Sequence, residues 1–232
     1  MGLRIKKSLY KRHPDDISRE PNKKIFVVCE GESTEIKYFE GIRDYSKELG
    51  ISNLIELIIM KKDSKSKGFS NPNGLICLAN DKINEFKRDN DKIYDTERDK
   101  FLIVFDRDKR DFKDYVDFID KHKDNFLLGV TNPCFELWLL LHSENSVEKI
   151  IKPNYNDILD NGKVSNNHTF ISSIVSNLYH MNPKRGMKFS KFASHVLYAI
   201  EQEKNLEQDL YKLEDTVGSN IGEVIEKVMM NK

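Results

Sequence analysis

The chain has 232 residues, of which 38% are apolar and 33% are charged. Its 38 Lys and Arg residues balance its 38 Asp and Glu residues, so the formal net charge of zero argues against a protein that coats nucleic acid nonspecifically. The three cysteines, Cys29, Cys77 and Cys134, form no CxxC pair, which argues against a disulfide framework or a zinc site. No apolar stretch is long enough to span a bilayer, and no secretory signal opens the sequence, so we expect a cytoplasmic protein that does not enter a membrane.

The sequence alternates between apolar runs and segments with helical spacing of apolar residues. The first 22 residues are polar and basic, and we expect an irregular arm there. Strands covered on both faces are predicted at four short apolar runs: 24–29, 54–59, 101–105 and 126–130. Helices are predicted between and after these strands, at about 34–49, 75–88, 112–122, 134–142, 169–181, 190–213 and 220–230.

This order of elements predicts an α/β fold with a mainly parallel, four-stranded sheet between helices. We expect residues 23–145 to form the sheet domain and residues 146–232 to form a helical C-terminal region packed on it. Ligands of open parallel sheets bind at the carboxyl ends of the strands. Three acidic or polar segments follow predicted strands and therefore become candidates for a site: Glu30, Asp106–Asp108 and Thr131–Glu136.

The carboxylates at these strand ends predict a divalent cation site. Asp106 and Asp108 follow the FLIVF run, and alternate residues of an extended chain point the same way. Glu30 ends the KIFVVC run and would complete the metal site or act as a general acid or base. Oxygen ligands of this kind suit Mg²⁺, with Mn²⁺ as an alternative. The competing interpretation is that these aspartates only form turns.

Other charged residues are secondary candidates. Glu136 lies in an apolar helix, so it is either a buried structural acid or a metal ligand. Glu32 and Glu35 lie beside Glu30, and one of them would serve a second metal ion while the other is a solvated helix residue. A basic segment without acids is a candidate nucleic-acid contact: Lys184, Arg185, Lys188 and Lys191.

Three segments of the sequence resemble the RloB family: 27–42 (VVCEGESTEIKYFEGI), 101–112 (FLIVFDRDKRDF) and 131–142 (TNPCFELWLLLH). They stand in the family's order and cover the N-terminal two-thirds of the chain. The resemblance implies a Toprim-like fold for residues 23–145, as the catalytic domain, and a place in bacterial phage defence, including abortive infection with an ATPase partner. Glu30 would be the Toprim glutamate, and Asp106 and Asp108 its paired aspartates.

The resemblance departs from one related pattern. Toprim nucleases of the overcoming-lysogenization-defect kind carry a second glutamate four residues after the first, whereas Glu35 follows Glu30 by five residues. Which of Glu32 and Glu35 takes the second-metal role therefore stays open at this point. Topoisomerase activity is not expected, because the chain has no room for a separate domain with a nucleophilic tyrosine.

The sequence therefore predicts a Mg²⁺-dependent nuclease that hydrolyses phosphodiester bonds of RNA, such as tRNA, or of DNA. Glu30, Asp106, Asp108 and Glu35 are the expected catalytic residues, and Glu136 joins the first three as an expected metal ligand. The alternative is a noncatalytic regulatory module bound to an ATPase partner, with structural acids. Primase-like nucleotidyl transfer is weaker, because no template-binding module is visible, and homo-oligomerisation is left open.

Overall fold

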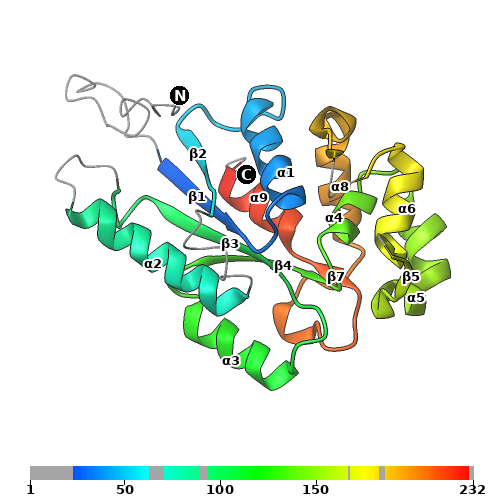
Figure 1. Ribbon diagram of the computed structural model, residues 1–232. Coiled ribbons are helices and arrows are strands. Elements are labelled where there is room, and N and C mark those ends of the chain that lie inside the picture. Colours follow the sequence, from blue (N-terminus) through cyan, green and yellow to red (C-terminus); the bar gives the residue numbers. More distant parts are fainter. Residues whose placement is uncertain (1–22, 63–70, 89–93, 167, 183–185, 230–232) are drawn as a thin grey trace.

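The computed structural model describes residues 23–62, 71–88, 94–166, 168–182 and 186–229. The basic arm, 1–22, lies outside these residues. Figure 1 shows an α/β arrangement in which helices flank a central twisted sheet. The prediction of an α/β fold with a mainly parallel sheet between helices is confirmed.

The central sheet has five strands, rather than the four that were predicted. Four of them are parallel and come from the predicted apolar runs: β1 (Lys23–Cys29), β2 (Ile55–Met60), β3 (Lys100–Asp106) and β4 (Leu127–Asn132). The fifth, β7 (Gly218–Ser219), pairs antiparallel with the end of β4, so that the order across the sheet is β2-β1-β3-β4-β7. The prediction missed β7 because two residues carry no apolar periodicity, and the C-terminal region is correspondingly not purely helical.

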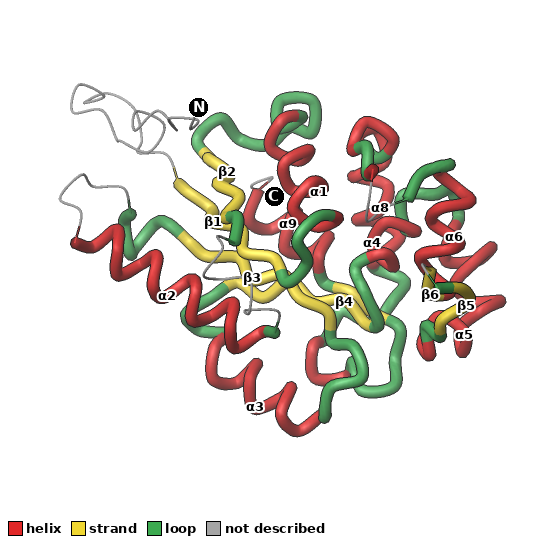
Figure 2. The backbone as a smooth tube through the Cα atoms, viewed as in Figure 1, coloured by secondary structure: helices red, strands yellow, loops and turns green. Residues whose placement is uncertain are grey.

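Alternate residues of each central strand pack into two different apolar clusters. In β1, Ile25 and Val27 face one cluster, whereas Phe26 and Val28 face the other. This is the pattern expected when a pleated strand is covered on both faces. One face is covered by α2 (Pro72–Arg88) and α3 (Phe112–His122), and the other by α1 (Thr34–Asp44) and α9 (Ile221–Met229) (Figures 1 and 2).

The remaining elements lie beyond β4 and belong mostly to the cluster that α1 and α9 cover. Their helices are α4 (Glu136–Leu140), α5 (Tyr155–Asp160), α6 (Phe170–Tyr179) and α8 (Val196–Glu203). Short helical turns join them: η2 (Val147–Ile151), η3 (Lys152–Asn154), η4 (Phe189–Lys191), η5 (Ala193–His195) and η6 (Leu210–Lys212). A small hairpin of β5 (Lys163–Ser165) and β6 (His168–Thr169) precedes α6.

The predicted helix at 190–213 is divided between η4, η5, α8 and η6. Within the described ranges, no helix is both long and apolar enough to cross a membrane.

Candidate functional site

The carboxyl ends of β1 and β3 bring Glu30 and Asp106 together. The two strands are neighbours, and the backbone amide of Glu30 donates to the Val104 carbonyl oxygen at 2.8 Å. The amide of Asp106 in turn donates to Glu30 Oε2 at 3.3 Å. The expected meeting of these two residues therefore follows directly from the parallel register, although 76 positions separate them in the sequence.

Two more carboxyl groups join this pair. Glu35 lies in the first turn of α1, and Glu136 begins α4 and is buried. Burial raises the pKa of Asp106 well above its usual range, and the charges of Glu35, Glu136 and Glu30 raise it further. Burial also raises the pKa of Glu35 to about 7, with a further contribution from Glu136 and Glu30. We call Glu30, Glu35, Asp106 and Glu136 the acid cluster.

The structure distinguishes between the two glutamates that follow Glu30. Glu32 is exposed at the turn before α1, whereas Glu35 turns back toward the sheet, and its carboxyl group lies against Gly31. Glu35 is therefore the member of the pair that reaches the acid cluster. The five-residue spacing from Glu30 suffices because residues 30–33 form an irregular connection before the helix begins at Thr34.

The end of β4 supports the acid cluster from the other side. Thr131 donates its hydroxyl proton to Asp106 Oδ1 at 2.7 Å. The chain then passes through a cis peptide bond between Asn132 and Pro133 and enters α4 at Glu136. The polar segment TNP thus holds one acid by a hydrogen bond and leads directly to another.

In the described part of the chain, two cations contact the cluster, and neither was predicted from the sequence. Arg110, in the loop before α3, forms an ion pair with Glu30 Oε1 and donates through Nε to the Asp106 carbonyl oxygen at 3.4 Å. Lys62, two residues after β2, donates to the Glu30 carbonyl oxygen at 2.6 Å. The only sequence signal for either residue was its position shortly after a strand.

Asp108 occupies a different environment from Asp106. Strand β3 ends at Asp106, and Asp108 lies in the following turn with a φ of 50° and an exposed side chain. Aspartate tolerates this left-handed conformation better than most residues. The alternation of an extended chain therefore does not continue to Asp108. Its neighbour Arg107 is buried, donates to the Asp108 carbonyl oxygen at 2.5 Å, and lies over the Phe112 ring at 5.5 Å.

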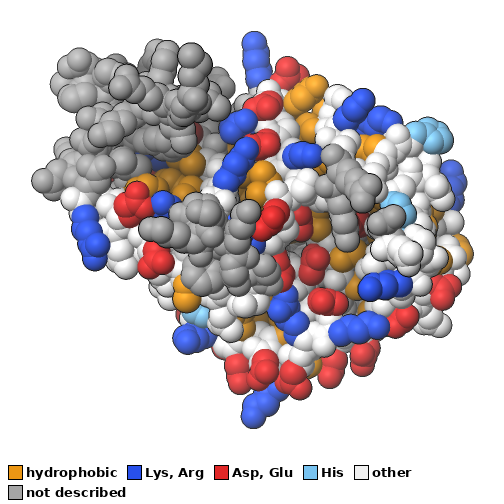
Figure 3. All heavy atoms as spheres, viewed as in Figure 1, with side chains coloured by type: hydrophobic (Ala, Val, Ile, Leu, Met, Phe, Trp, Pro, Cys, Tyr) orange, Lys and Arg blue, Asp and Glu red, His pale blue; other side chains and the backbone are white. Residues whose placement is uncertain are grey.

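A large cavity adjoins this turn. Its volume is about 810 Å³, and it lies between the ends of β3 and β4 and the α5–β5 segment. Its lining includes Asp108 and four cations: Arg107, Lys109, Arg110 and Lys163. Figure 3 shows acidic and basic side chains interspersed over the described surface of one face, in keeping with the zero net charge.

The predicted basic segment is only partly described. Lys184 and Arg185 lie outside the described residues. Lys188 and Lys191 are exposed, and the ammonium group of Lys191 donates a hydrogen bond to the Tyr179 carbonyl oxygen. Phe189 between them packs against Tyr38 of α1 with ring centroids 5.2 Å apart, so this segment is anchored to the helix that carries Glu35.

The chemistry of the acid cluster suits Mg²⁺ or Mn²⁺, which prefer carboxylate oxygens. Two of its side chains nevertheless accept from protein donors: Glu30 from Arg110 and the Asp106 amide, and Asp106 from Thr131. Accordingly, the described part of the chain contains no group of three or more His, Cys, Asp or Glu side chains arranged to hold a metal ion. Glu30 and Asp106, with Glu35 or Glu136, would hold an ion after these side chains turn.

In a comparison with protein families, the model of the RloB-like protein family matches residues 25–228. The chain belongs to the RloB-like family. The match covers almost the whole sheet, the acid cluster and nearly all of the C-terminal region. It therefore extends well past residue 142, where the last segment that carried the resemblance in the sequence ends. Comparison with curated proteins and with solved structures gives no match.

Proposed function

We propose that this RloB-like protein is a Mg²⁺-dependent nuclease of the Toprim type that hydrolyses phosphodiester bonds. The observation that carries the proposal is the convergence of four carboxyl groups at one end of a parallel sheet, where burial and the charges of the neighbouring acids raise the pKa of Glu35 and of Asp106. Mutual repulsion between buried acids destabilises a fold unless a cation or a proton compensates it. Clusters of this kind are therefore typical of functional sites.

Three residues of the acid cluster and two neighbouring cations have roles in the proposed reaction. Glu30 and Asp106 would hold the ion, and a bound Mg²⁺ would polarise the phosphate and activate water. Glu35, whose pKa is about 7, takes up and releases a proton near neutral pH, as a general acid or base requires. Arg110 and Lys62 place positive charge beside Glu30, where they would neutralise phosphate oxygens.

We further propose that the nuclease is an effector of bacterial phage defence that works with an ATPase partner. Membership of the RloB-like family supports this role. The substrate is RNA, with structured RNA such as tRNA as the first candidate, or DNA. A zero net charge favours a selective, regulated nuclease over one that cuts any nucleic acid it meets.

The direct test is a cleavage assay on total tRNA, plasmid DNA and single-stranded DNA in the presence of Mg²⁺, Mn²⁺ or EDTA. Each assay is repeated with and without the proposed ATPase partner. Asp106→Asn keeps the shape of the side chain and removes its charge, and we expect it to lower cleavage at least about 100-fold. Asp117→Asn, on the exposed surface of α3, is the matched control. Full activity of Asp106→Asn, or no metal-dependent cleavage under any of these conditions, contradicts the proposal.

A noncatalytic module on the surface of an ATPase is the second candidate. It is favoured by the hydrogen bonds and the ion pair that already occupy Glu30 and Asp106. A Mg²⁺ titration followed by melting temperature separates the two, since an ion that binds only the folded state raises the melting temperature. If the protein is a nuclease, Mg²⁺ should raise its melting temperature, and Asp106→Asn should remove that rise. Asp108→Asn tests whether the exposed aspartate also contributes to Mg²⁺ binding.

A further inference from the structure

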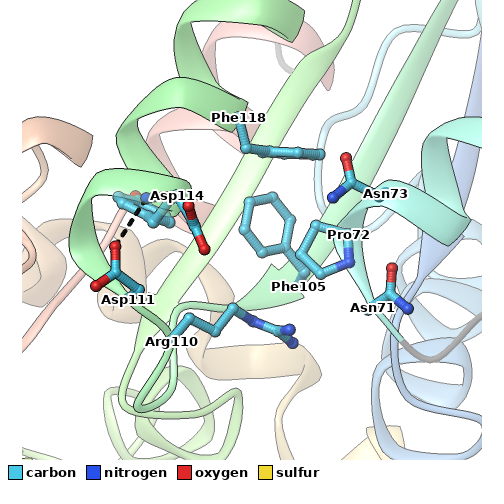
Figure 4. Close-up of a pocket in the computed structure, with 9 residues that line it drawn as sticks. Asn71, Pro72, Asn73, Phe105, Arg110, Asp111, Asp114 and Phe118 are labelled. Carbon is cyan, nitrogen blue, oxygen red and sulfur yellow. Dashed lines mark hydrogen bonds between the residues drawn. The ribbon is translucent and has the colours of Figure 1, made fainter.

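Arg110 also lines a second, smaller cavity. Its volume is about 210 Å³, and it lies between the start of α2 and the start of α3, at the end of β3 (Figure 4). The rings of Phe105, Tyr115, Phe118 and Pro72 line its apolar part. We call this cavity the aromatic slot. Ligand pockets for drug-sized molecules have volumes of roughly 300–1,000 Å³, so the slot has room for one small ring system rather than a whole nucleotide.

The polar residues of the aromatic slot are arranged around its rim. Asn71 and Asn73, at the start of α2, lie across the slot from Arg110 in Figure 4. Asn71 Oδ1 accepts from the Gly74 amide at 2.9 Å, and no described residue accepts a hydrogen bond from its NH₂ group. Asn73 is exposed, and within the described ranges its side chain forms no hydrogen bond. The rim therefore offers both donors and an acceptor to a planar polar edge.

The acids of the slot decide which part of a nucleotide it fits. Asp111 and Asp114 line the side next to α3, and their charges repel a phosphate group. A neutral, flat heterocycle is not repelled, and it stacks favourably on aromatic rings. The charge and the shape of the lining together select a base over a phosphate.

Arg110 connects the slot to the acid cluster. Its guanidinium group lines the slot and pairs with Glu30, so the two sites are one residue apart. A nucleotide whose base lies in the slot has its phosphate displaced toward Arg110 and Glu30, where the proposed hydrolysis takes place. Proteins that read single-stranded nucleic acid commonly separate stacking from phosphate contacts in this way.

We propose that the aromatic slot holds one unstacked base of a single-stranded or looped nucleic acid, next to the phosphate that is cut. The inference rests on the proposed nuclease function. It adds that the substrate must present an unpaired base at the cleavage position, and that Asn73 reads its edge.

The test measures binding in EDTA, so that it does not depend on cleavage. The probes are pentanucleotides of RNA and DNA with each base at the central position, and an abasic pentanucleotide of the same charge. We expect at least one base to bind about fivefold or more tightly than the abasic probe. Asn73→Ala should weaken that binding roughly three- to tenfold and leave abasic binding unchanged. Asn84→Ala, an exposed asparagine further along α2, should change neither.

Two outcomes contradict the proposed role of the aromatic slot. One is equal affinity for the abasic probe and for the probes that carry a central base, and the other is a base preference that Asn73→Ala does not alter. If cleavage by the native protein depends on Asp106 while either outcome holds, the nuclease proposal stands and the slot fails. If the base preference depends on Asn73 while no substrate is cut, the slot stands and the nuclease proposal fails. Cleavage mapping of Asn73→Ala gives a second readout, because the base preference at the cut site should weaken with the affinity.

Discussion

The carboxyl group of Glu35 lies against the backbone of Gly31, so closely that a Cβ atom at position 31 would be 2.0 Å from Glu35 Oε2 and 2.4 Å from its Cδ. Real Cβ atoms essentially never come this near to another heavy atom. Gly31 therefore provides the space that lets Glu35 turn back from α1 toward Glu30 and Asp106. A side chain at this position would displace the carboxyl group of Glu35.

Gly31→Ala should separate the position of Glu35 from the stability of the fold. The displaced group is the end of a flexible side chain, so we expect the free energy of unfolding to change by no more than about 1 kcal/mol. Metal-dependent cleavage should fall about tenfold or more, because a misplaced proton-transfer group is ineffective. Gly186→Ala is the control, since among the described residues no atom lies within 4 Å of its added Cβ. Equal activity of the two variants would count against a role for Glu35.

Glu35→Gln should change how stability depends on pH. The pKa of Glu35 is raised from 4.5 to about 7 in the folded chain, so the folded state binds the proton more tightly than the unfolded state does. This residue therefore lowers the free energy of unfolding as the pH rises from about 4.5 to about 7, and no further above that range. Glu35→Gln removes this loss of stability, which is no more than about 3.4 kcal/mol.

Urea unfolding at several pH values between 4.5 and 8 measures this effect. The stability of Glu35→Gln relative to the native protein should increase across the window, whereas Glu32→Gln, at the exposed neighbour, should run parallel to the native curve. Some slope should remain in Glu35→Gln, because the buried Glu203 also has a pKa of about 7. Saturating Mg²⁺ should flatten the native curve if the ion binds beside Glu35. Superimposable curves for all three proteins would refute the proposed proton uptake.

Arg110→Ala should destabilise the metal-free protein and make it more dependent on Mg²⁺. The substitution leaves Glu30 beside the other acids without its guanidinium partner. We expect a loss of about 1–2 kcal/mol, which corresponds to a fall in melting temperature of roughly 2–8 °C. Lys109→Ala, in the same loop as Arg110, breaks an exposed ion pair with Asp160 and should leave the melting temperature nearly unchanged. Added Mg²⁺ should restore more stability to Arg110→Ala than to the native protein, and an equal response of both would contradict this account.

Asn220→Ala should loosen the outer edge of β4. The Asn220 side chain accepts from the Val130 amide at 2.7 Å and donates to the Leu128 carbonyl oxygen at 2.9 Å, and all of these groups are buried. Leaving two backbone groups unsatisfied costs about 2–4 kcal/mol. Hydrogen exchange at the Val130 amide should accelerate together with the loss of global stability. Asn205→Ala, which removes only two long hydrogen bonds of 3.4 Å at the surface, should have little effect on either measurement.

The fold was largely predictable because local sequence patterns indicate where its parallel strands lie. Runs such as IFVVC and FLIVF are apolar at every position and are buried on both faces, which is typical of strands covered by helices on both sides. The contacts of Glu30 with Asp106 followed from strands that end at the same edge. Strand β7 could not be predicted, because Gly218 and Ser219 owe their conformation to β4 rather than to their own side chains.

The site was less predictable than the sheet, because it depends on how the strands pair and on where the chain turns after each strand. Arg110 and Lys62 are two of many cations in the sequence, and only the paired strands bring them to Glu30. Asp108 was expected beside Asp106, but the chain leaves the strand at Asp106, and the spacing of alternate residues no longer fixes where Asp108 points. The apolar runs predicted the four parallel strands reliably, whereas the helix predicted at 190–213 and the geometry beyond the end of β3 were not predicted correctly.

The pairing of Thr131 with Ser219 joins the hydroxyl group that holds Asp106 to a strand encoded 88 positions later. A ribosome releases the sheet's apolar runs and all four carboxyl groups long before it releases that strand. Until then, the rim of β4 has no neighbour on one side, and the support of Asp106 is incomplete. A polypeptide whose translation stops before residue 218 would contain all four carboxyl groups of the acid cluster. It would lack β7, the strand that pairs with the end of β4 beside Asp106.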